Sequence, residues 1–550
     1  MQSRNAPRRL VRSLTGPLTR SLTRPPTGPP TGPPSRPVRR PRLASFVPVA
    51  LVAALLAGCS PTAGRSTTTD GATADVSPGN TLTWGWYLPT SWDPVTSTAG
   101  QDVHALALVY DALVQQEDDG DARPGLAESW TYNETGDQVT FHLRDGLTFT
   151  DGTPLDAEAV KANLLRGRDQ PNSTIAAQLS VITDVTVDSP TDVTLHLDQP
   201  DFQIPLLLAG KNGMQVSPAA FGADVDAIAT APVGSGPFTL TEYVPDSHAA
   251  VVKNEEYWNA DAILLGGVDL RPTPDPTVAV AGIRSGQYGL AVVPPAQVAA
   301  AEQAGLTVEE ITAFTVRVID VDATVAPYDD PRVLQAISHA LDRQALVDVS
   351  FFGRGSPNWQ PFPDGYVAYD DDLDELYEFD QDAARALLAE AGHAKGLDLT
   401  LTIGTAVDQA LAEQIQSQLA EVGITVTIQM ATPGTSNYVT REYPFYLDSF
   451  SGRESPVQAL EVLFGPEGLM NLGRTSPPDL QPAIDAVRAV PLDDPAYPGL
   501  LQEAVSTAVT QMPNTFLFTW PRIFVHDDRV RDFRHQIGTV RFEGVWVEAS

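Results

Sequence analysis

The side chains that could carry out catalysis are scattered through this sequence of 550 residues. Its eight histidines include no His-x-x-x-His pair of the kind that holds a catalytic zinc, and neither a Gly-x-Ser-x-Gly nor a Walker phosphate-binding sequence occurs. Neighbouring carboxylates such as Asp329-Asp330 are more typical of solvated turns than of acid–base pairs. The sequence therefore favours a binding protein over an enzyme, with no catalytic residue, metal or cofactor.

Charge and cysteine content exclude two classes of protein. Lysine and arginine number 35 against 69 aspartates and glutamates, which gives a net charge of −34. Nucleic-acid binders normally show a basic surface, so this charge argues against one. The single cysteine excludes a disulfide framework and a structural zinc site built from cysteines. At roughly 150 residues per domain, the length predicts about three or four folding units.

The N-terminal segment has a composition unlike that of the rest of the chain. Residues 1–58 contain ten arginines and no acidic residue, which predicts a removable targeting segment. The apolar run at 46–57 is shorter than the about 20 residues that span a bilayer, and it suits the hydrophobic part of a signal peptide. Residues 59–79 are rich in Ser, Thr, Gly and Ala, and they predict a flexible tether.

The lone cysteine ends a short motif that follows the apolar run. The order Leu56-Ala57-Gly58-Cys59 resembles the lipobox of bacterial lipoproteins. This resemblance implies that the signal peptide of residues 1–58 is removed and that Cys59 then carries a lipid. The protein would be held on the outer face of the cytoplasmic membrane. The alternative is a buried free cysteine.

Hydrophobic periodicity in the first part of the body changes from strands to helices. Alternating apolar residues predict strands at 81–88 and 139–143. Apolar residues at helical spacing predict a helix over 102–115, and Asp156 is placed to cap a further helix. The alternation of both element types indicates a mixed α/β fold.

The second half of the body contains a strand–helix–strand unit. Residues 397–403 and 424–429 predict the two strands, and 408–421 predict the helix between them. Gly423 follows the helix where a terminating glycine is expected. Just before this unit, Asp380 is placed to cap another helix.

Several short motifs follow one another in a fixed order along the chain. They are 126–130 (LAESW), 139–146 (VTFHLRDG), 149–158 (FTDGTPLDAE), 234–238 (GSGPF), 253–258 (KNEEYW), 327–343 and 377–392. Together they resemble the extracytoplasmic solute-binding proteins of ABC importers, in the family 5 cluster that takes up oligopeptides, dipeptides and nickel. Lys253 and Glu255 depart from the pattern of that family. Most of these motifs are expected to set turns and core packing.

The resemblance implies an α/β fold of the type II periplasmic-binding-protein class. Two lobes close around a ligand as a clamp, and the first lobe carries an extra subdomain. Carried onto this chain, the first lobe comprises residues 80–111, 233–313 and 521–550. The inserted subdomain comprises residues 112–232, and the second lobe comprises residues 314–520.

An enclosed solute needs aromatic walls and a few placed charges. In peptide-binding members, an aspartate of the second lobe holds the α-ammonium of the ligand, and its counterpart here is Asp448; the alternative is a loop carboxylate that caps backbone amides. Arg441 is a candidate partner for a ligand carboxylate, or else a surface arginine. The candidate aromatic walls are Trp86, Tyr87, Trp359, Phe518 and Trp520, of which Trp86 fits the core equally well.

These features predict a lipid-anchored receptor of an ABC importer. It captures a small solute, a short peptide or another amine-bearing molecule, and delivers that solute to the permease. The implied partners are the permease, its ATPase and the membrane, and the receptor is expected to be a monomer. The alternatives are a sensor that reports the ligand to a membrane partner and a secreted hydrolase.

Overall fold

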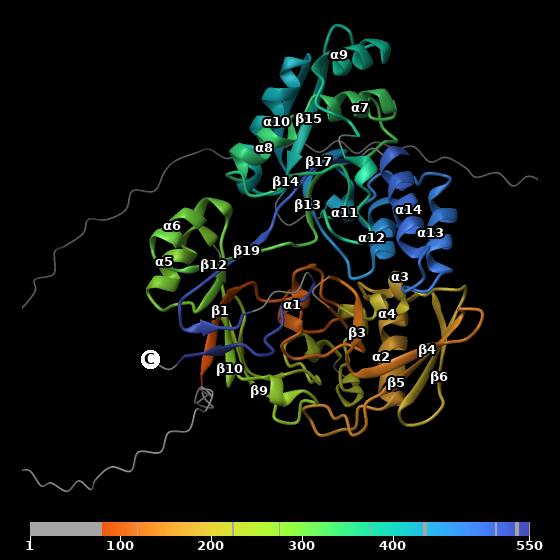
Figure 1. Cartoon of the computed structure of the whole chain (residues 1–550), viewed down its shortest axis with the longest axis vertical. Coiled ribbons are helices and arrows are strands. Elements are labelled where there is room, and N and C mark those ends of the chain that lie inside the picture. Colours follow the sequence, from red (N-terminus) through yellow and green to blue (C-terminus); the bar gives the residue numbers. More distant parts are fainter. Residues whose placement is uncertain are drawn as a thin grey trace, which may run out of the picture. The chain divides into compact units, whose positions relative to one another are not determined.

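The computed structural model describes residues 80–548 apart from 118, 223–224, 274, 375, 433–436, 512–513 and 534–537, and these residues belong to one compact unit. The predicted signal peptide, Cys59 and the tether lie outside them. Helices and strands are mixed along the described chain, and most strands form three large sheets (Figure 1). The predicted α/β class is confirmed. Within the described residues, no helix combines the length and apolar character needed to cross a membrane.

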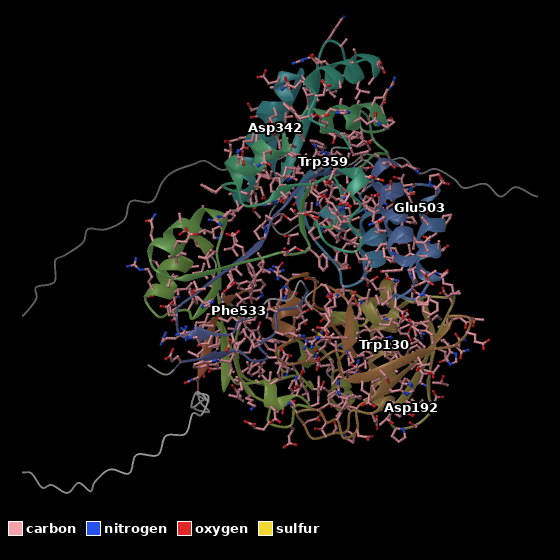
Figure 2. The ribbon with its side chains drawn as sticks, viewed as in Figure 1. Trp130, Asp192, Asp342, Trp359, Glu503 and Phe533 are labelled. Carbon is pink, nitrogen blue, oxygen red and sulfur yellow. The ribbon has the colours of Figure 1, made fainter. Side chains whose placement is uncertain are left out.

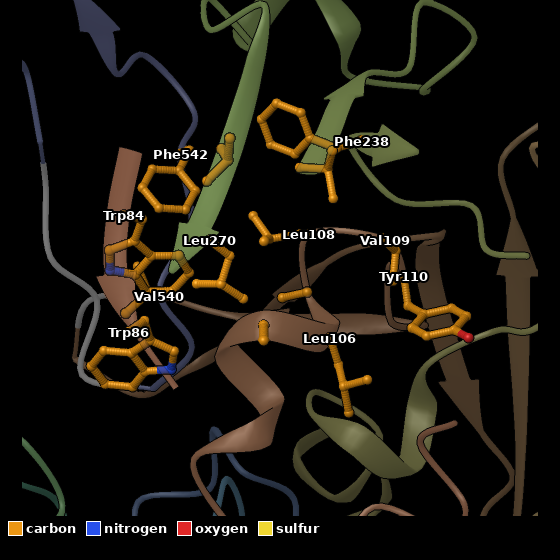
Figure 3. Close-up of a cluster of buried hydrophobic side chains, with 14 of the residues drawn as sticks. Trp84, Trp86, Leu106, Leu108, Val109, Tyr110, Phe238, Leu270, Val540 and Phe542 are labelled. Carbon is orange, nitrogen blue, oxygen red and sulfur yellow. The ribbon is translucent and has the colours of Figure 1, made fainter. Parts of the chain in front are cut away.

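The seven-stranded sheet has β1 (Thr81–Trp86) at its centre, parallel to both of its neighbours. Alternation along β1 buries Leu82, Trp84 and Trp86 in one core. There the ring of Trp84 meets that of Phe542 at a centroid distance of 5.1 Å (Figure 3). In sheet order, the strands are β12 (Thr307–Ile311), β19 (Arg522–His526), β11 (Leu290–Val292), β1, β10 (Gly267–Pro272), β9 (His248–Lys253) and β8 (Phe238–Val244). The helices of this part are α1 (Asp102–Leu106), α5 (Ala279–Arg284) and α6 (Val298–Gln303).

The helix predicted over 102–115 is wrong in its length, because α1 ends at Leu106. Farther along, the amide of Leu113 donates to the carbonyl of Gly213 (3.1 Å), and β2 (Val114–Gln116) is a strand. The chain here bonds to distant segments instead of to its own preceding turn. Helical spacing did not reveal this, because a buried irregular segment also places most of its apolar side chains inside.

The turn at 234–236 passes very close to the backbone of Val109 and Tyr110. A Cβ on Gly234 would collide with the carbonyl oxygen of Val109, and a Cβ on Gly236 would lie 2.6 Å from the amide nitrogen of Tyr110. The amide of Gly236 also donates to the carbonyl of Val109 (3.0 Å). Both glycines are therefore required by close approach of two backbone segments.

Gly234→Ala is expected to lower the free energy of unfolding by about 1–3 kcal/mol, because the added methyl group forces buried backbone apart. Chemical denaturation measures this loss. Gly499→Ala in the exposed start of α14 (Tyr497–Gln511) is the control, since a Cβ there meets nothing within 4 Å. Alanine favours a helix, so the control should be unchanged or more stable by up to about 1 kcal/mol. Equal stability of Gly234→Ala and the native protein would contradict the close approach.

The four-stranded sheet is antiparallel throughout and packs against α2 (Ala157–Asp169). The carboxylate of Asp156 accepts a hydrogen bond from the amide of Ala159 (3.0 Å), which confirms the predicted cap. The predicted strand at 139–143 is also confirmed. In sheet order, the strands are β4 (Ala127–Tyr132), β5 (Gln138–Leu143), β7 (Asp192–Leu197) and β6 (Ile182–Val187); α3 (Ala176–Leu179), α4 (Ile204–Leu207) and the pairing of β2 with β3 (Ala122–Pro124) complete this part.

The six-stranded sheet separates two hydrophobic cores. Its strands, in sheet order, are β14 (Ser356–Pro357), β18 (Thr515–Thr519), β13 (Thr315–Val321), β17 (Phe445–Ser451), β15 (Leu397–Ile403) and β16 (Ile424–Met430). The helices of one core are α7 (Pro331–His339), α8 (Arg343–Ser350), α9 (Gln381–Glu390) and α10 (Gln409–Glu421). The helices of the other core are α12 (Pro456–Phe464), α13 (Leu480–Arg488) and α14, and these two groups lie on either side of β13 and β17 (Figure 1).

The predicted strand–helix–strand unit is confirmed by β15, α10 and β16, whose two strands pair in parallel. Gly423 adopts a φ of +89°, the left-handed conformation expected of a glycine that ends a helix. The carboxylate of Asp380 accepts hydrogen bonds from the amides of Asp382 and Ala383 at the start of α9. Local signals for caps and turns were therefore sufficient for this half of the chain.

Two segments cross side by side between the seven-stranded and six-stranded sheets. Ile311 pairs with Arg522 at the first sheet, and Val316 pairs with Thr519 at the second. Between these pairs, the hydroxyl of Thr315 donates to the carbonyl of Trp520 (2.8 Å). The predicted boundaries of two lobes and a subdomain stay a prediction; the paired crossing marks where a hinge between them would lie.

Candidate functional site

A cavity of about 670 Å³ is lined by segments from the parts of the chain that carry all three large sheets. They include 98–104 beside β1, 173–178 and 211–212 beside the four-stranded sheet, and 451–454 at the end of β17. Phe314 and Arg522 of the crossing segments also line it. The volume lies within the range of about 300–1,000 Å³ that is typical of small-molecule sites.

Lys211 is a cation on the wall formed by the four-stranded part. Its ammonium donates to the carbonyl of Ser97 (2.7 Å) and lies 3.4 Å from the hydroxyl of Thr174. Burial lowers the pKa of Lys211 to about 8, and the negative charge of Asp102 acts in the opposite direction. Its ammonium is therefore held in place by the protein and faces the cavity with less charge than a solvated lysine has.

Arg453 and Glu454 follow β17 and also line the cavity. The guanidinium of Arg453 donates to the carbonyls of Ser451 (2.6 Å) and Gly452 (3.1 Å), and burial lowers its pKa. Burial also raises the pKa of Glu454. The Glu454 carboxylate stands directly over Gly210, where a Cβ would collide with it.

Arg522 lies where the crossing segment enters the seven-stranded sheet. Its guanidinium is 5.7 Å from the ring centroid of Trp86, within the range of a cation–π contact. Burial lowers the pKa of Arg522 to about 10. Its Nη1 atom is buried and has no hydrogen-bond partner among the described residues.

Polar contacts join the four-stranded part to the helices of the six-stranded part. Arg488 at the end of α13 forms an ion pair with Asp201 (Nε–Oδ2, 3.1 Å) and another with Glu461 (2.7 Å). The amide of Phe202 donates to the carbonyl of Arg488 (2.9 Å). Nearer the cavity, the side chain of Gln116 donates to the carbonyl of Glu454 (3.0 Å).

Asp448 lies within β17, one contact away from the cavity. The hydroxyl of Tyr438 donates to its carboxylate, and the amide of Ser449 donates to the other oxygen (2.7 Å). Tyr438 itself lines the cavity. Burial raises the pKa of Asp448, and the fully buried Asp320 on the adjacent strand β13 also has a raised pKa. Both oxygens of the predicted ammonium partner therefore already accept hydrogen bonds from the protein.

Trp359 lies in the six-stranded part (Figure 2). It lines a different and smaller cavity, of about 260 Å³. Its ring centroid lies 5.0 Å from the buried guanidinium of Arg343. This guanidinium donates to the carbonyls of Phe516 and Ser338 and to the hydroxyl of Ser338, so the protein supplies its partners.

The other predicted aromatic residues lie outside both sets of lining residues. Trp86 is buried in the core behind Arg522 and His104, two residues that do line the larger cavity. Tyr87 packs edge-on against Trp86 and is half exposed. Phe518 is fully buried, and it packs with Trp520 around Phe351. The exposed Arg441 likewise lies away from the cavity walls, with a φ of +52°. None of the seven predicted contacts lines the larger cavity, and their ligand role stays a prediction.

Sequence reasoning missed Lys211, Arg453, Glu454 and Arg522. One signal was available: the charged pair Arg453-Glu454 lies in the short segment between a strand and Ser455, a residue type that caps helices. The structure shows Ser455 as that cap, its hydroxyl accepting from the amide of Gln458 (3.3 Å). Within the described residues, no group of three or more His, Cys, Asp or Glu side chains is arranged to hold a metal ion.

Comparisons with known proteins agree on one family. Residues 121–468 match the family model of bacterial extracellular solute-binding proteins, family 5, middle region. Glutathione-binding protein GsiB of Escherichia coli K12 is 32% identical over 314 residues, which is 56% of this chain and 61% of that protein. The chain thus matches less than two thirds of the length of this relative.

Two solved structures have similar folds. DppA of Helicobacter pylori in complex with the peptide STSA superposes with a TM-score of 0.77 at 22% identity, over 86% of this chain and 98% of that one. AgaA of A. tumefaciens R10 in complex with agropinic acid gives a TM-score of 0.76 at 25% identity, over 86% and 99%. The family match covers more than half of the chain, and the fold agrees with it. The chain therefore belongs to the family 5 bacterial extracellular solute-binding proteins, which bind their solutes without acting as enzymes.

Proposed function

We propose that this protein is the receptor of an ABC importer and that it encloses a short peptide or peptide-like solute in the 670 Å³ cavity. The observation that carries this proposal is the lining of that cavity by segments from three sheet-bearing parts of the chain. A solute there would contact all three parts at once, and closure around the paired crossing segments would exclude water from it. The names of GsiB and DppA, which refer to glutathione and to a bound peptide, support this class of solute.

Native mass spectrometry of the purified protein, followed by calorimetric titration after removal of any bound solute, tests this proposal. The peptide probe set consists of glutathione, the tetrapeptide Ser-Thr-Ser-Ala and the dipeptide Met-Leu, which the names of similar proteins suggest. We expect a co-purified solute or saturable binding of at least one probe with a Kd below about 100 μM, the affinity of a specific but reversible site. Absence of both would contradict the proposal.

We also propose that a lipid on Cys59 anchors the receptor to the membrane. Cys59→Ala removes the thiol that would be acylated, so the protein should move from the membrane fraction to the soluble fraction on cell fractionation. Ser60→Ala, which changes the next residue and leaves the thiol, should remain with the membrane. Equal membrane association of both variants would rule out this anchor.

A further inference from the structure

The charges that face the large cavity are opposite in sign to the charge of the whole protein. Among its described lining residues, Lys211, Arg453 and Arg522 are basic and Glu454 is the one carboxylate, whereas the full chain has a net charge of −34. A cavity with low-dielectric walls concentrates the field of the charges that line it. The local excess of positive charge therefore influences which solutes bind in the cavity.

The three cations differ in how far the protein already compensates them. The field of Asp102 acts on Lys211, and that of Glu454 acts on both Lys211 and Arg453. No carboxylate among the described residues forms an ion pair with Arg522, and burial lowers the pKa of its guanidinium. Arg522 is thus the cation of the cavity that lacks a counter-ion in the described chain.

The hydrogen bonds of Arg522 lead to the same conclusion. Its Nη1 is buried without a partner among the described residues, and a buried donor left unsatisfied costs roughly 1–3 kcal/mol, more for a charged group. Trp86 packs beside the guanidinium, and Arg522 as a whole is partly exposed and lines the cavity. A carboxylate there would accept hydrogen bonds from the planar guanidinium and neutralise its charge.

Building on the proposed function, we infer that the solute is a peptide-like anion, with at least one more carboxylate than ammonium groups, and that one of its carboxylates binds Arg522. Arg453 adds to the positive potential of the cavity, which the carboxylate of Glu454 offsets only in part. This differs from the expectation of an amine-bearing cationic ligand held by Asp448, a residue that lies behind Tyr438 and already accepts hydrogen bonds from Tyr438 and Ser449.

Calorimetric titration of the purified protein at pH 7 with three tripeptides tests the inference. Ala-Glu-Ala, Ala-Gln-Ala and Ala-Lys-Ala have nearly the same length and differ in net charge. We expect Ala-Glu-Ala to bind at least about tenfold more tightly than Ala-Lys-Ala, with Ala-Gln-Ala between them. A tenfold difference in affinity is what one charge-assisted hydrogen bond is expected to contribute.

Two variants test whether Arg522 is the residue that causes the preference for the acidic peptide. In Arg522→Gln, the preference for Ala-Glu-Ala over Ala-Lys-Ala should fall from at least about tenfold to less than about threefold. In Arg531→Gln, which removes an exposed arginine paired with Glu548 on the surface, the preference should be unchanged. Circular dichroism establishes that both variants fold. If Arg522→Gln does not fold, Arg453→Gln should still reduce the preference, because it removes another positive charge from the cavity.

The outcomes separate this inference from the proposed function. Binding of all three peptides with equal affinity would overturn the inference and leave the receptor function standing. A preference that survives unchanged in Arg522→Gln would overturn the role of that residue. Failure of these peptides and of the whole peptide probe set to bind would contradict the receptor function itself.

Discussion

Replacing Asp111 with asparagine is expected to lower the free energy of unfolding by about 3–5 kcal/mol, the cost of leaving a buried charge without its partner. Asp111 lies between α1 and β2 and is completely buried. Its carboxylate accepts from the hydroxyl of Tyr257 (2.9 Å), the indole of Trp258 (2.7 Å) and the amide of Gln115 (2.8 Å), and it pairs with Arg541 (3.3 Å).

The pH dependence of this effect follows from the pKa of Asp111. Burial acts to raise that pKa, but Arg541 and the three donors outweigh burial and hold it below its usual range. A carboxyl with a lowered pKa in the folded state contributes stability above its unfolded value of about 3.9 and loses it as the pH falls. The difference between the native protein and Asp111→Asn should therefore be largest near neutral pH and shrink below about pH 4.

Urea denaturation from pH 7 down to pH 3 measures both the loss of stability in Asp111→Asn and its dependence on pH. Glu548→Gln is the matched control, because it breaks an exposed ion pair with Arg531 and should cost less than about 1 kcal/mol. The double variant Asp111→Asn with Arg541→Met should recover part of the loss, since the buried guanidinium of Arg541, which would keep only its longer ion pair with Glu543 (3.5 Å), is then absent. A cost for Asp111→Asn as small as that of the control would contradict this account of the buried cluster.

Replacing Arg488 with methionine is expected to weaken binding of the peptide probe set by at least about tenfold. Arg488 stands between Asp201 of the four-stranded part and Glu461 of α12, and burial raises the pKa of Asp201 to about 6 although the guanidinium is only 3.1 Å away. Without Arg488, the arrangement seen in the structure would hold the carboxylates of Asp201 and Glu461 near each other with no cation between them. If the four-stranded and six-stranded parts moved apart, both carboxylates would return to water. Closure of these parts around a solute would therefore become less favourable.

Calorimetry measures this loss of affinity, and small-angle X-ray scattering should show a larger radius of gyration for Arg488→Met in the presence of a saturating probe. Arg385→Met is the control, because its partner Asp382 is almost fully exposed at the start of α9. That variant should bind and scatter as the native protein does. If Arg488→Met also behaves as the native protein, these ion pairs do not stabilise closure.

Features set by a few neighbouring residues could be predicted from the sequence. The caps at Asp156 and Asp380 and the glycine at 423 depend on local hydrogen bonds and backbone conformation, and all three were confirmed. The segment after Leu106 could not be predicted, because its partners such as Gly213 lie about a hundred residues away. The motif at 253–258 was expected to be structural, and Tyr257 and Trp258 indeed bind the buried Asp111.

The cavity was less predictable than the fold for the same reason. Lys211, Arg453 and Arg522 come from three distant segments, and no spacing in the sequence relates them. Asp448 was expected on a loop of the second lobe, whereas it lies within the strand β17, and the sequence did not show that Tyr438 would cover it. Residues on loops become solute contacts only when the sheets bring their segments together, and the spacing of residues in the sequence does not show this.

Hydrogen–deuterium exchange with and without the tightest-binding member of the peptide probe set is the sharpest test of whether one solute in the larger cavity contacts all three sheet-bearing parts of the chain. We expect slower exchange in four segments together, 98–104, 173–178, 211–212 and 451–458, because one solute would contact the walls that they form. Unchanged exchange in these segments, or protection confined to 328–343 beside the smaller cavity, would contradict it.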